Sequence, residues 1–458
     1  PVKGGETQRF VENGTLPSRW WTLFGSPTLN GWVDQAFSQS PTLDLALATL
    51  RQSEAQYQAQ TGELYPSLSA NAGGSRNKTV ISGATGNGGG NQTAIYNLFD
   101  ATVSVRYALD LWGGVASGIR ASAAALDAER QNTRAAYLTL AGNVVTPSVS
   151  LASAEARLKT ARQIVDAYDN TVKLVQKRFD LGASSRSDVV AIQALAAQAA
   201  ANVPPLETQA VQARNRLATL VGKAPSAFDT APFDLDALTL PTEIPLTLPS
   251  ALVQQRPDIV AAEANLRLAS ANVGVAMANQ FPSLVLSAQY GSQSGEFKSL
   301  FDQNIWSVAG NLTAPILDGG RLSAQKRAAV AAYDAAQARY RSTVLEAFRQ
   351  VADSLAAVEI DARALAAQQA AYTAAQQNTQ LVEKRFKAGS ANIIEVRDAQ
   401  LSEGQAQILF VQTLAARYAD TAALFQALGG NGWPEAMAAA ESQNPAAYGL
   451  RASDNGTH

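Results

Sequence analysis

Apolar and polar residues alternate at every second position in several segments of the chain. Residues 102–110 show this most regularly, and one apolar face consists of Val103, Val105, Tyr107 and Leu109. Ser104 and Arg106 fall on the opposite face. Residues 283–293 and 305–317 repeat the period, and one face of the latter holds Trp306, Val308, Leu312 and Ile316. With a weaker segment near residues 68–76, the pattern predicts four β-strands in two pairs.

A helical period fills the longest stretches, where glycine is nearly absent. Over residues 115–181 an apolar seam suited to a partner helix consists of Tyr168, Val172, Val175 and Phe179. One helix over this stretch would be about 100 Å long. Gly182 and Gly389 predict left-handed helix ends, and a returning helix follows each. Pro147 predicts a kink and Pro204-Pro205 a break, so we expect two helical hairpins with tips near 180–188 and 387–395.

Repeated segments indicate that the chain consists of two similar halves, near residues 41–222 and 257–429. Leu174-Val175-Gln176-Lys177-Arg178-Phe179 recurs 207 positions later as Leu381-Val382-Glu383-Lys384-Arg385-Phe386. Tyr65-Pro66-Ser67-Leu68 recurs 216 positions later as Phe281-Pro282-Ser283-Leu284. The change of offset places a longer loop in the first half, at the glycine-rich residues 83–90, which we interpret as mobile. We predict an internal duplication of a domain-sized motif.

Composition excludes several classes of site. The 458 residues include no Cys, and the single His is His458, the last residue. Disulfides, thiolate metal sites, a Cys nucleophile, a Ser-His-Asp triad and a His metal cluster are therefore not expected. The net charge of −2 gives no basic excess for nucleic-acid binding. We predict no enzyme activity, no catalytic residues, no cofactor and no metal site.

The hydropathy pattern leaves two kinds of protein open. No stretch approaches the roughly 18 consecutive apolar residues of a transmembrane helix, so the chain is either soluble or a β-barrel membrane protein. Four strands cannot close, and a barrel in lipid needs about 8 or more. Two copies would supply eight strands and three would supply twelve. Because an eight-stranded barrel is filled by its own side chains, long helices around a lumen favour three copies.

Four motifs, in order along nearly all of residues 18–433, resemble those of outer-membrane efflux factors of the TolC/OprM class. They are Trp20-Trp21-Thr22-Leu23-Phe24 with Ser26-Pro27-Thr28-Leu29, Leu109-Asp110-Leu111-Trp112-Gly113-Gly114, Gln255-Arg256-Pro257-Asp258-Ile259 with Ala262-Glu263, and Leu428-Gly429-Gly430. The subgroup resembled serves resistance–nodulation–division (RND) pumps. Its members usually carry a lipidated N-terminal Cys. This chain begins at Pro1-Val2-Lys3, which we interpret as a mature or trimmed form, either cut after that Cys or without the anchor.

The resemblance implies an α+β membrane protein. It implies a homotrimer, with each chain giving four strands to a twelve-stranded transmembrane β-barrel in the outer membrane of a Gram-negative bacterium. A long periplasmic α-helical barrel of coiled-coil hairpins and a mixed equatorial domain are also implied. The predicted segments are 1–42 (N-terminal, equatorial), 43–64 (helix), 65–112 (β-hairpin), 113–222 (helical hairpin), 223–256 (equatorial connector), 257–280 (helix), 281–318 (β-hairpin), 319–429 (helical hairpin) and 430–458 (equatorial, with a disordered tail).

The function implied is a passive exit duct of a tripartite efflux pump, which conducts drugs and other toxic small molecules. The partners implied are a periplasmic adaptor protein, an inner-membrane RND pump and outer-membrane lipid. Two alternatives stay open at this point: a TolC-like duct for secreted proteins or metal ions, and an elongated coiled-coil structural protein without a pore. The alternation of apolar and polar residues in the strands, with Tyr107 and Trp306 as interface aromatics, argues against the structural protein without a pore.

Functional residues are expected at the hairpin tips and in the strands. By resemblance, Glu395 and Asp398 form an acidic ring that lines the periplasmic aperture; a solvated helix face is the alternative. Asp188 and Phe386 are expected to contact the closed aperture, although Ala391 stands where the family has a basic partner. The residues expected to contact the adaptor are Lys177, Arg178, Gly182, Lys384, Arg385 and Gly389, although the cations also suit helix C-termini. Val103, Val105, Tyr107 and Leu109 are expected to face lipid.

Overall fold

The computed structural model describes residues 4–12, 14, 16–81, 92–228, 233–246 and 253–429. The predicted loop at 83–90 and the tail from Asn431 lie outside these residues. The elements in chain order are β1 (Arg9–Glu12), η1 (Trp20–Phe24), α1 (Pro27–Gln39), α2 (Pro41–Gly62), β2 (Ser67–Ile81), β3 (Gln92–Leu109), α3 (Gly114–Asp180), α4 (Arg186–Ala201), α5 (Val203–Leu220), η2 (Pro225–Ala227), η3 (Leu235–Ala237), β4 (Glu243–Leu246), α7 (Pro257–Ala278), β5 (Ser283–Ser294), η4 (Phe297–Ser299), β6 (Asn304–Thr313), α8 (Arg321–Lys387) and α9 (Ile393–Leu428).

The chain divides into two compact units. The first consists of Pro1–Arg51, Arg130–Ala261 and Arg341–His458, and the second of Gln52–Glu129 and Ala262–Tyr340. Both long helices, α3 and α8, begin in the second unit and end in the first. Each has 67 residues, or about 100 Å of helix.

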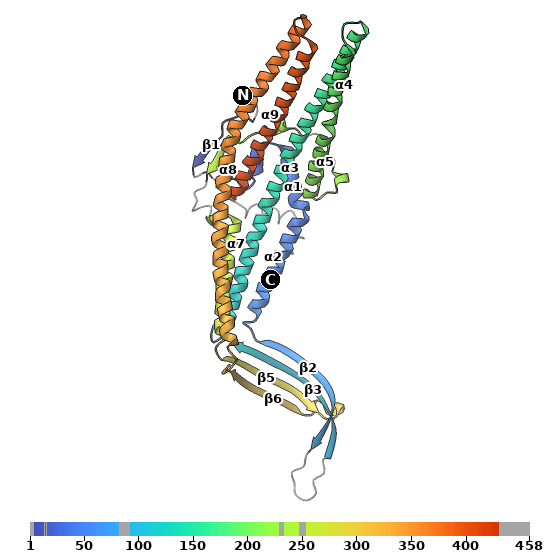
Figure 1. Cartoon of the computed structure of the whole chain (residues 1–458). Coiled ribbons are helices and arrows are strands. Elements are labelled where there is room, and N and C mark those ends of the chain that lie inside the picture. Colours follow the sequence, from blue (N-terminus) through green and yellow to red (C-terminus); the bar gives the residue numbers. More distant parts are fainter. Residues whose placement is uncertain are drawn as a thin grey trace, which may run out of the picture. The chain divides into compact units, whose positions relative to one another are not determined.

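A single four-stranded antiparallel sheet dominates the second unit (Figure 1). Its strand order is β2-β3-β5-β6, so the two hairpins predicted from the sequence pair through β3 and β5. The strands β2 and β6 form its edges, with no further strand paired to either among the described residues. The sheet is therefore open, and each edge presents unpaired backbone groups.

One strand boundary predicted from alternation is wrong. The period suggested a strand over residues 305–317 with Ile316 on its apolar face, but β6 ends at Thr313. Pro315 follows and cannot donate to a ladder, so Ile316 and Leu317 lie outside the strand with nearly all of their side-chain surface exposed.

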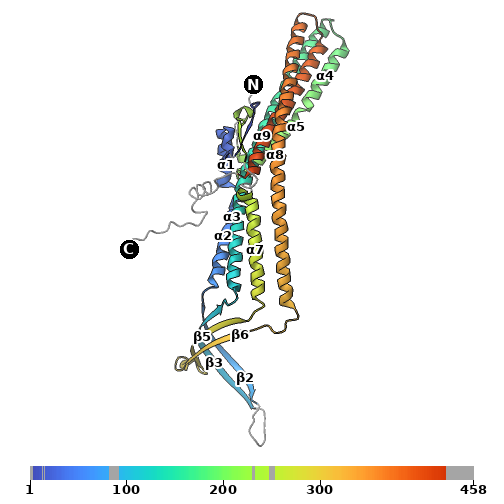
Figure 2. The same cartoon turned by 90° about the vertical axis from the view of Figure 1, so that its left-hand side faces the viewer.

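The helices of the first unit form two hairpins, α3–α4 and α8–α9, which lie side by side in both views (Figures 1 and 2). The helix α3 continues through Pro147 without interruption. The returning arm of the first hairpin breaks at Asn202, between α4 and α5, just before Pro204-Pro205. The returning helix α9 of the second hairpin is continuous. The break predicted for the first half alone is thus confirmed.

One stretch, Arg186–Leu220, has the length and apolar composition that could cross a membrane, although only 11 % of its most apolar window is buried. This differs from the expectation that the chain has no such helix, and alanine supplies most of the apolar character. The stretch is α4 and α5 together. Val189 and Ile192 of α4 are buried against Val175 of α3, so α4 is one arm of a helical hairpin.

The core of the first unit gathers the aromatic residues of the N-terminal segment. Trp20, Trp21 and Phe24 are fully buried, and the Trp20 ring lies 5.9 Å from the ring of Phe425 on α9. The short strand β1 pairs in parallel with β4, which ties the N-terminus to the connector between the halves. The segments that read from the sequence as connectors therefore help to form the main core.

Candidate functional site

The two hairpin tips end their long helices in the same way. Gly182 and Gly389 have φ of 75° and 77°, which confirms the predicted left-handed ends. In each turn the amide of the residue after the glycine donates to the carbonyl five residues before it, at 2.7 Å in the first tip and 2.9 Å in the second. These bonds satisfy carbonyls at the helix ends that would otherwise lack partners.

A capping box starts the returning helix of each hairpin. The backbone N–H of Asp188 donates to Ser185 Oγ at 3.1 Å, and that of Ser185 donates to Asp188 Oδ2 at 2.9 Å. Asn392 and Glu395 make the equivalent bonds at 2.9 and 3.2 Å. The hydrogen bond from the Ser185 backbone holds the pKa of Asp188 below its usual value. Asp188 and Glu395, two of the three carboxylates predicted at the aperture, thus stabilise the first turn of a helix.

A small apolar core closes each tip. In the first tip it consists of Val175, Val189 and Ile192, and in the second of Val382, Val396 and Ala399. Ile393 packs against both cores. Ala391 packs against the second core.

An aromatic contact joins the two tips. The guanidinium carbon of Arg178 lies 5.7 Å from the centroid of the Phe386 ring. A cation held over an aromatic face at this distance is attracted by about 0.5–1 kcal/mol at an exposed site. Arg178 and Phe386, predicted separately as a tip cation and an aperture residue, therefore interact directly.

The other predicted tip cations lie in the last turns of α3 and α8 and are exposed. Arg385 bonds within its own tip, since its Nη2 donates to Ser390 O at 3.0 Å. The same nitrogen lies 3.5 Å from Glu395 Oε2. Lys177 and Lys384 precede Arg178 and Arg385 by one residue. The last turns of α3 and α8 therefore each carry exposed cations, which suit the negative ends of these helices.

The acidic pair of α9 carries two arginine partners, one of which sequence reasoning missed. Besides the contact of Glu395 with Arg385, Asp398 accepts from Arg397 at 2.6 Å. The Arg397 side chain is 21 % exposed and that of Asp398 is 60 % exposed, so the carboxylate is the outer partner. Arg397 and Asp398 are neighbours in the sequence, and neighbouring side chains on a helix rarely face each other, so the sequence did not predict this pair. Glu395 and Asp398 are thus brought to one helix face, each beside a guanidinium.

The sheet of the second unit has one apolar and one polar face. Its register aligns Val103 with Ala70, Tyr290 and Trp306 across all four strands. The same apolar face contains Leu68, Val105, Tyr107, Leu109, Leu284, Leu286, Val308 and Leu312. On the other face Ser104 pairs with Ser69 and Gln289, and the Ser69 and Ser104 hydroxyls are 2.9 Å apart.

Side chains on the apolar face of the sheet are largely uncovered. Val103 and Val105 are exposed, and Tyr107 and Leu109 are half-buried. On the edge strand, Trp306 and Val308 are 75 % and 76 % exposed. A contiguous exposed apolar surface of this kind is typical of a surface that contacts lipid or protein.

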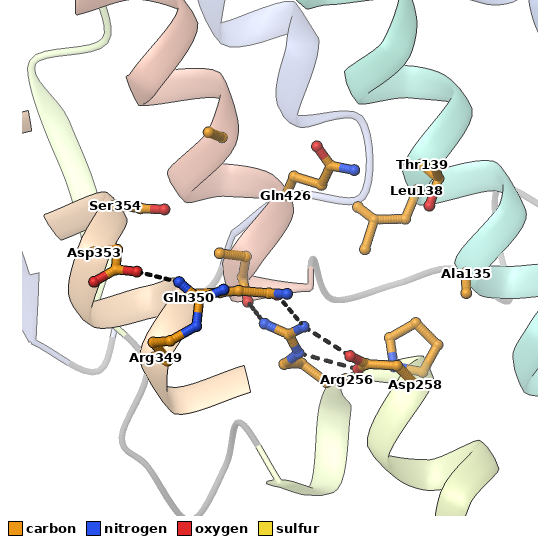
Figure 3. Close-up of a pocket in the computed structure, with 13 residues that line it drawn as sticks. Ala135, Leu138, Thr139, Arg256, Asp258, Arg349, Gln350, Asp353, Ser354 and Gln426 are labelled. Atoms are coloured by element: carbon orange, nitrogen blue, oxygen red, sulfur yellow. Dashed lines mark hydrogen bonds and ion pairs between the residues drawn. The ribbon is translucent and has the colours of Figure 1, made fainter. Parts of the chain in front are cut away.

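A buried arginine lies where the C-terminus of α9 meets the N-terminus of α7 (Figure 3). Arg256 Nη1 donates to Ala427 O at 2.7 Å, and its Nη2 donates to Asp258 Oδ2 at 2.7 Å and to Gln350 Oε1 at 2.8 Å. Its side chain is 8 % exposed. The motif that contains it therefore joins α7, α8 and α9, and the guanidinium complements the negative end of α9.

Metal-binding geometry is not found in the part of the chain that the structure describes. No group of three or more His, Cys, Asp or Glu side chains is arranged there to hold an ion. The features described above, at the hairpin tips, the two faces of the sheet and the helix junction, make up the candidate site.

Comparison with known proteins points to one group. A family model described as "Outer membrane efflux protein" matches residues 32–223 and 248–430. The pyoverdine export outer membrane protein OpmQ of Pseudomonas aeruginosa is 32 % identical over 416 residues, covering 91 % of this chain and 87 % of that protein. Outer membrane protein OprJ of the same organism is 32 % identical over 421 residues, covering 91 % and 86 %.

Similarity extends to solved structures. The outer-membrane channel OprN superimposes with a TM-score of 0.85 at 27 % identity, covering 94 % of this chain and 96 % of that one.

Proposed function

Because the chain belongs to the outer membrane efflux protein family, we propose that three copies of it form a passive exit duct for toxic small molecules. Membership places the chain in the outer membrane of a Gram-negative bacterium, as a channel component of an efflux pump and not as an enzyme.

The open four-stranded sheet is the observation that carries the proposal. Lipid cannot satisfy the unpaired backbone groups of β2 and β6, so each edge needs a partner strand. Pairing β6 of one copy with β2 of the next would continue the order around a ring. Three copies would give twelve strands, which is wide enough to leave a lumen that four or eight strands would not.

The two faces of the sheet would then have different surroundings, lipid on one face and the water-filled lumen on the other. The apolar face with Val103, Val105, Tyr107 and Leu109 would contact lipid, and the face with Ser104 and Arg106 would line the lumen. The large exposed fractions of Trp306 and Val308 on the same apolar face support this orientation. The aromatic Trp306 and Tyr290 would stabilise it at a membrane interface.

The hairpin tips would form the periplasmic aperture. Glu395 and Asp398 of three copies would place acidic groups around one constriction, and such a ring favours cations. Ala391 provides no basic side chain for the ion pair that the family resemblance implies, so closure of the aperture would depend on other contacts. Ile393, shared by both tip cores, and the Arg178–Phe386 pair join the two hairpins of one chain and would supply that closure.

The partners proposed are a periplasmic adaptor and an inner-membrane pump of the RND type. The relative OpmQ is named for pyoverdine export, a further relative for toluene efflux, and neither substrate is assigned to this chain. The exposed cations at Lys177, Arg178, Lys384 and Arg385, beside the turns at Gly182 and Gly389, give the adaptor a surface to dock on.

The equivalent turn and capping-box hydrogen bonds of the two tips also support an internal duplication.

One experiment tests the duct. The purified full chain in detergent should have three times the 48.1 kDa mass of one chain and should form ion-conducting channels in a planar lipid bilayer. A monomer of this mass, or a trimer without conductance, would overturn the proposal. A strand variant, Val308→Arg, serves as a control that should lose both properties together.

A further inference from the structure

A cavity of about 260 Å³ lies where α3, the junction of α4 and α5, and α9 meet, all within the first unit. Its floor and walls are mainly apolar, from Ala161, Ile164, Leu195, Ala199, Leu401 and Ile408. Four polar, uncharged side chains complete it: Tyr168, Gln198, Asn202 and Gln405. Among the residues that the structure describes, no Asp, Glu, Lys or Arg lines it.

The cavity has identifiable causes in the sequence. On one side Gly404 lets α9 approach α3 closely, since an added Cβ would stand 2.4 Å from Ile164 Cδ1. On the other side α4 ends at Ala201 and α5 begins at Val203, so the helix is interrupted at Asn202, which lines the cavity. The cavity therefore lies between a close approach of α3 and α9 and a helix interruption.

The side chains around the cavity are arranged as in a ligand site. Ala161 and Tyr168 are buried at its floor, while Gln198, Asn202 and Gln405 are exposed at its rim. Tyr168 is 6 % exposed, and burial raises the pKa of its hydroxyl. Asn202 makes no side-chain capping bond. An apolar floor with a few polar groups is the pattern of small-molecule pockets.

We propose that this cavity binds one uncharged, mainly apolar small molecule that carries a hydrogen-bonding group. The lining side chains offer an ionic ligand no opposite charge, so an ion would lose its hydration without compensation. Since a cavity of about 150 Å³ holds benzene, 260 Å³ suits about ten non-hydrogen atoms. A bound molecule would contact both hairpins at once and so stabilise their packing.

Binding of 2-naphthol, an uncharged bicyclic phenol, to the full chain in lipid nanodiscs tests the proposal. Equilibrium dialysis against empty nanodiscs should show one saturable site per chain, and the ligand should raise the melting temperature. Ala199→Phe, which fills the cavity, should weaken binding at least ten-fold. Ala200→Phe, on the next, exposed residue of α4, should keep the affinity within two-fold.

Two outcomes would overturn the inference: no saturable binding beyond the empty nanodisc, or equal affinity in the two phenylalanine variants. Ala161→Met fills the cavity from α3 and keeps the test decisive if Ala199→Phe fails to fold. The readout is independent of conductance, so a failure of the duct proposal and a failure of this one are distinguishable.

Discussion

The two hairpins of the chain end their helices alike but carry different charges. Gly182 and Gly389 have the same backbone conformation, and both returning helices begin with a capping box. At the position of Asp398, however, the first half has Ala191. Helix-ending chemistry is thus common to both halves because any tight hairpin needs it. Asp398 has no counterpart in the first half, so its charge is not needed to form the hairpin.

The two halves also differ at the C-terminal ends of their returning helices. In the second half, Gly429 follows α9 beside the side chain of the buried Arg256. In the first half, an added Cβ at Gly222 would stand 2.2 Å from the carbonyl oxygen of Gln39, so backbone contact closes the junction. Ser40, 216 positions before Arg256, cannot make the same bridge. One half joins its helices by close approach and the other by a charged side chain.

Arg256→Ala should give the largest effect on stability. It removes a charged donor from the carbonyl of Ala427, from Gln350 and from Asp258, and because a hydrogen bond to a charged group contributes about 1.5–3 kcal/mol, the total loss should be about 3–5 kcal/mol. Guanidinium unfolding of the purified protein measures it. Ser40→Ala, at the equivalent position of the first half, should cost under about 1 kcal/mol; equal losses would remove the distinction between the junctions.

Arginine on the apolar face of the sheet should be nearly as damaging, and equally so in both halves. Val105→Arg and Val308→Arg occupy the same face, so each should impair assembly by about 2–4 kcal/mol if it lies at the bilayer midplane. Ser104→Arg, on the polar face, should be tolerated. The yield of trimer in outer-membrane fractions checks this, and tolerance of all three variants would contradict the assignment of faces.

Alanine at the tip glycines should cost about 1 kcal/mol in each hairpin. An added Cβ at Gly182 or Gly389 would meet no atom within 4 Å, so the cost is that of left-handed backbone alone. Asparagine, which tolerates this conformation, should recover part of the loss. Thermal unfolding of the four variants checks the prediction, and a clear difference between the two alanine variants would show that the tips are not equivalent.

A carboxyl pair found only in the second half should make stability depend on pH. Burial, and then the neighbouring Asp420, raise the pKa of Asp361 to about 7. The folded chain therefore holds a proton that the unfolded chain releases near pH 4, and stability falls as pH rises from about 4 to about 7. The first half has Ala154 and Ala213 at these positions.

Asp361→Asn should accordingly raise the melting temperature at pH 8 and change it little at pH 5. Because the carboxyl is partly exposed, solvent screening should keep the effect below about 1 kcal/mol. An equal shift at both pH values would show that the pair does not share a proton in the folded chain.

Much of this fold follows from local sequence chemistry. Alternation identified the faces of β3, and Gly182 and Gly389 predicted the tips, because side-chain period and left-handed glycine are local properties. Pro315 shortened β6 because a missing N–H outweighs side-chain alternation. The Arg397–Asp398 pair, the bridge made by Arg256 and the contact of Arg178 with Phe386 depend on helix packing. In each of these contacts, the partner of a residue cannot be predicted from the hydrophobic period of the sequence.

Ion selectivity tests the central claim, that the second tip supplies the charged mouth of a trimeric duct. In planar bilayers wild-type channels should be cation-selective and blocked by divalent ions added on the periplasmic side. Glu395→Gln with Asp398→Asn removes the charge, and a glutamine can keep the capping bond of Glu395. This variant should lose most of the selectivity and the block, while Asp188→Asn in the first tip keeps both. If the double variant keeps the wild-type reversal potential and block, the acidic pair is a solvated helix face and the account of the mouth is wrong.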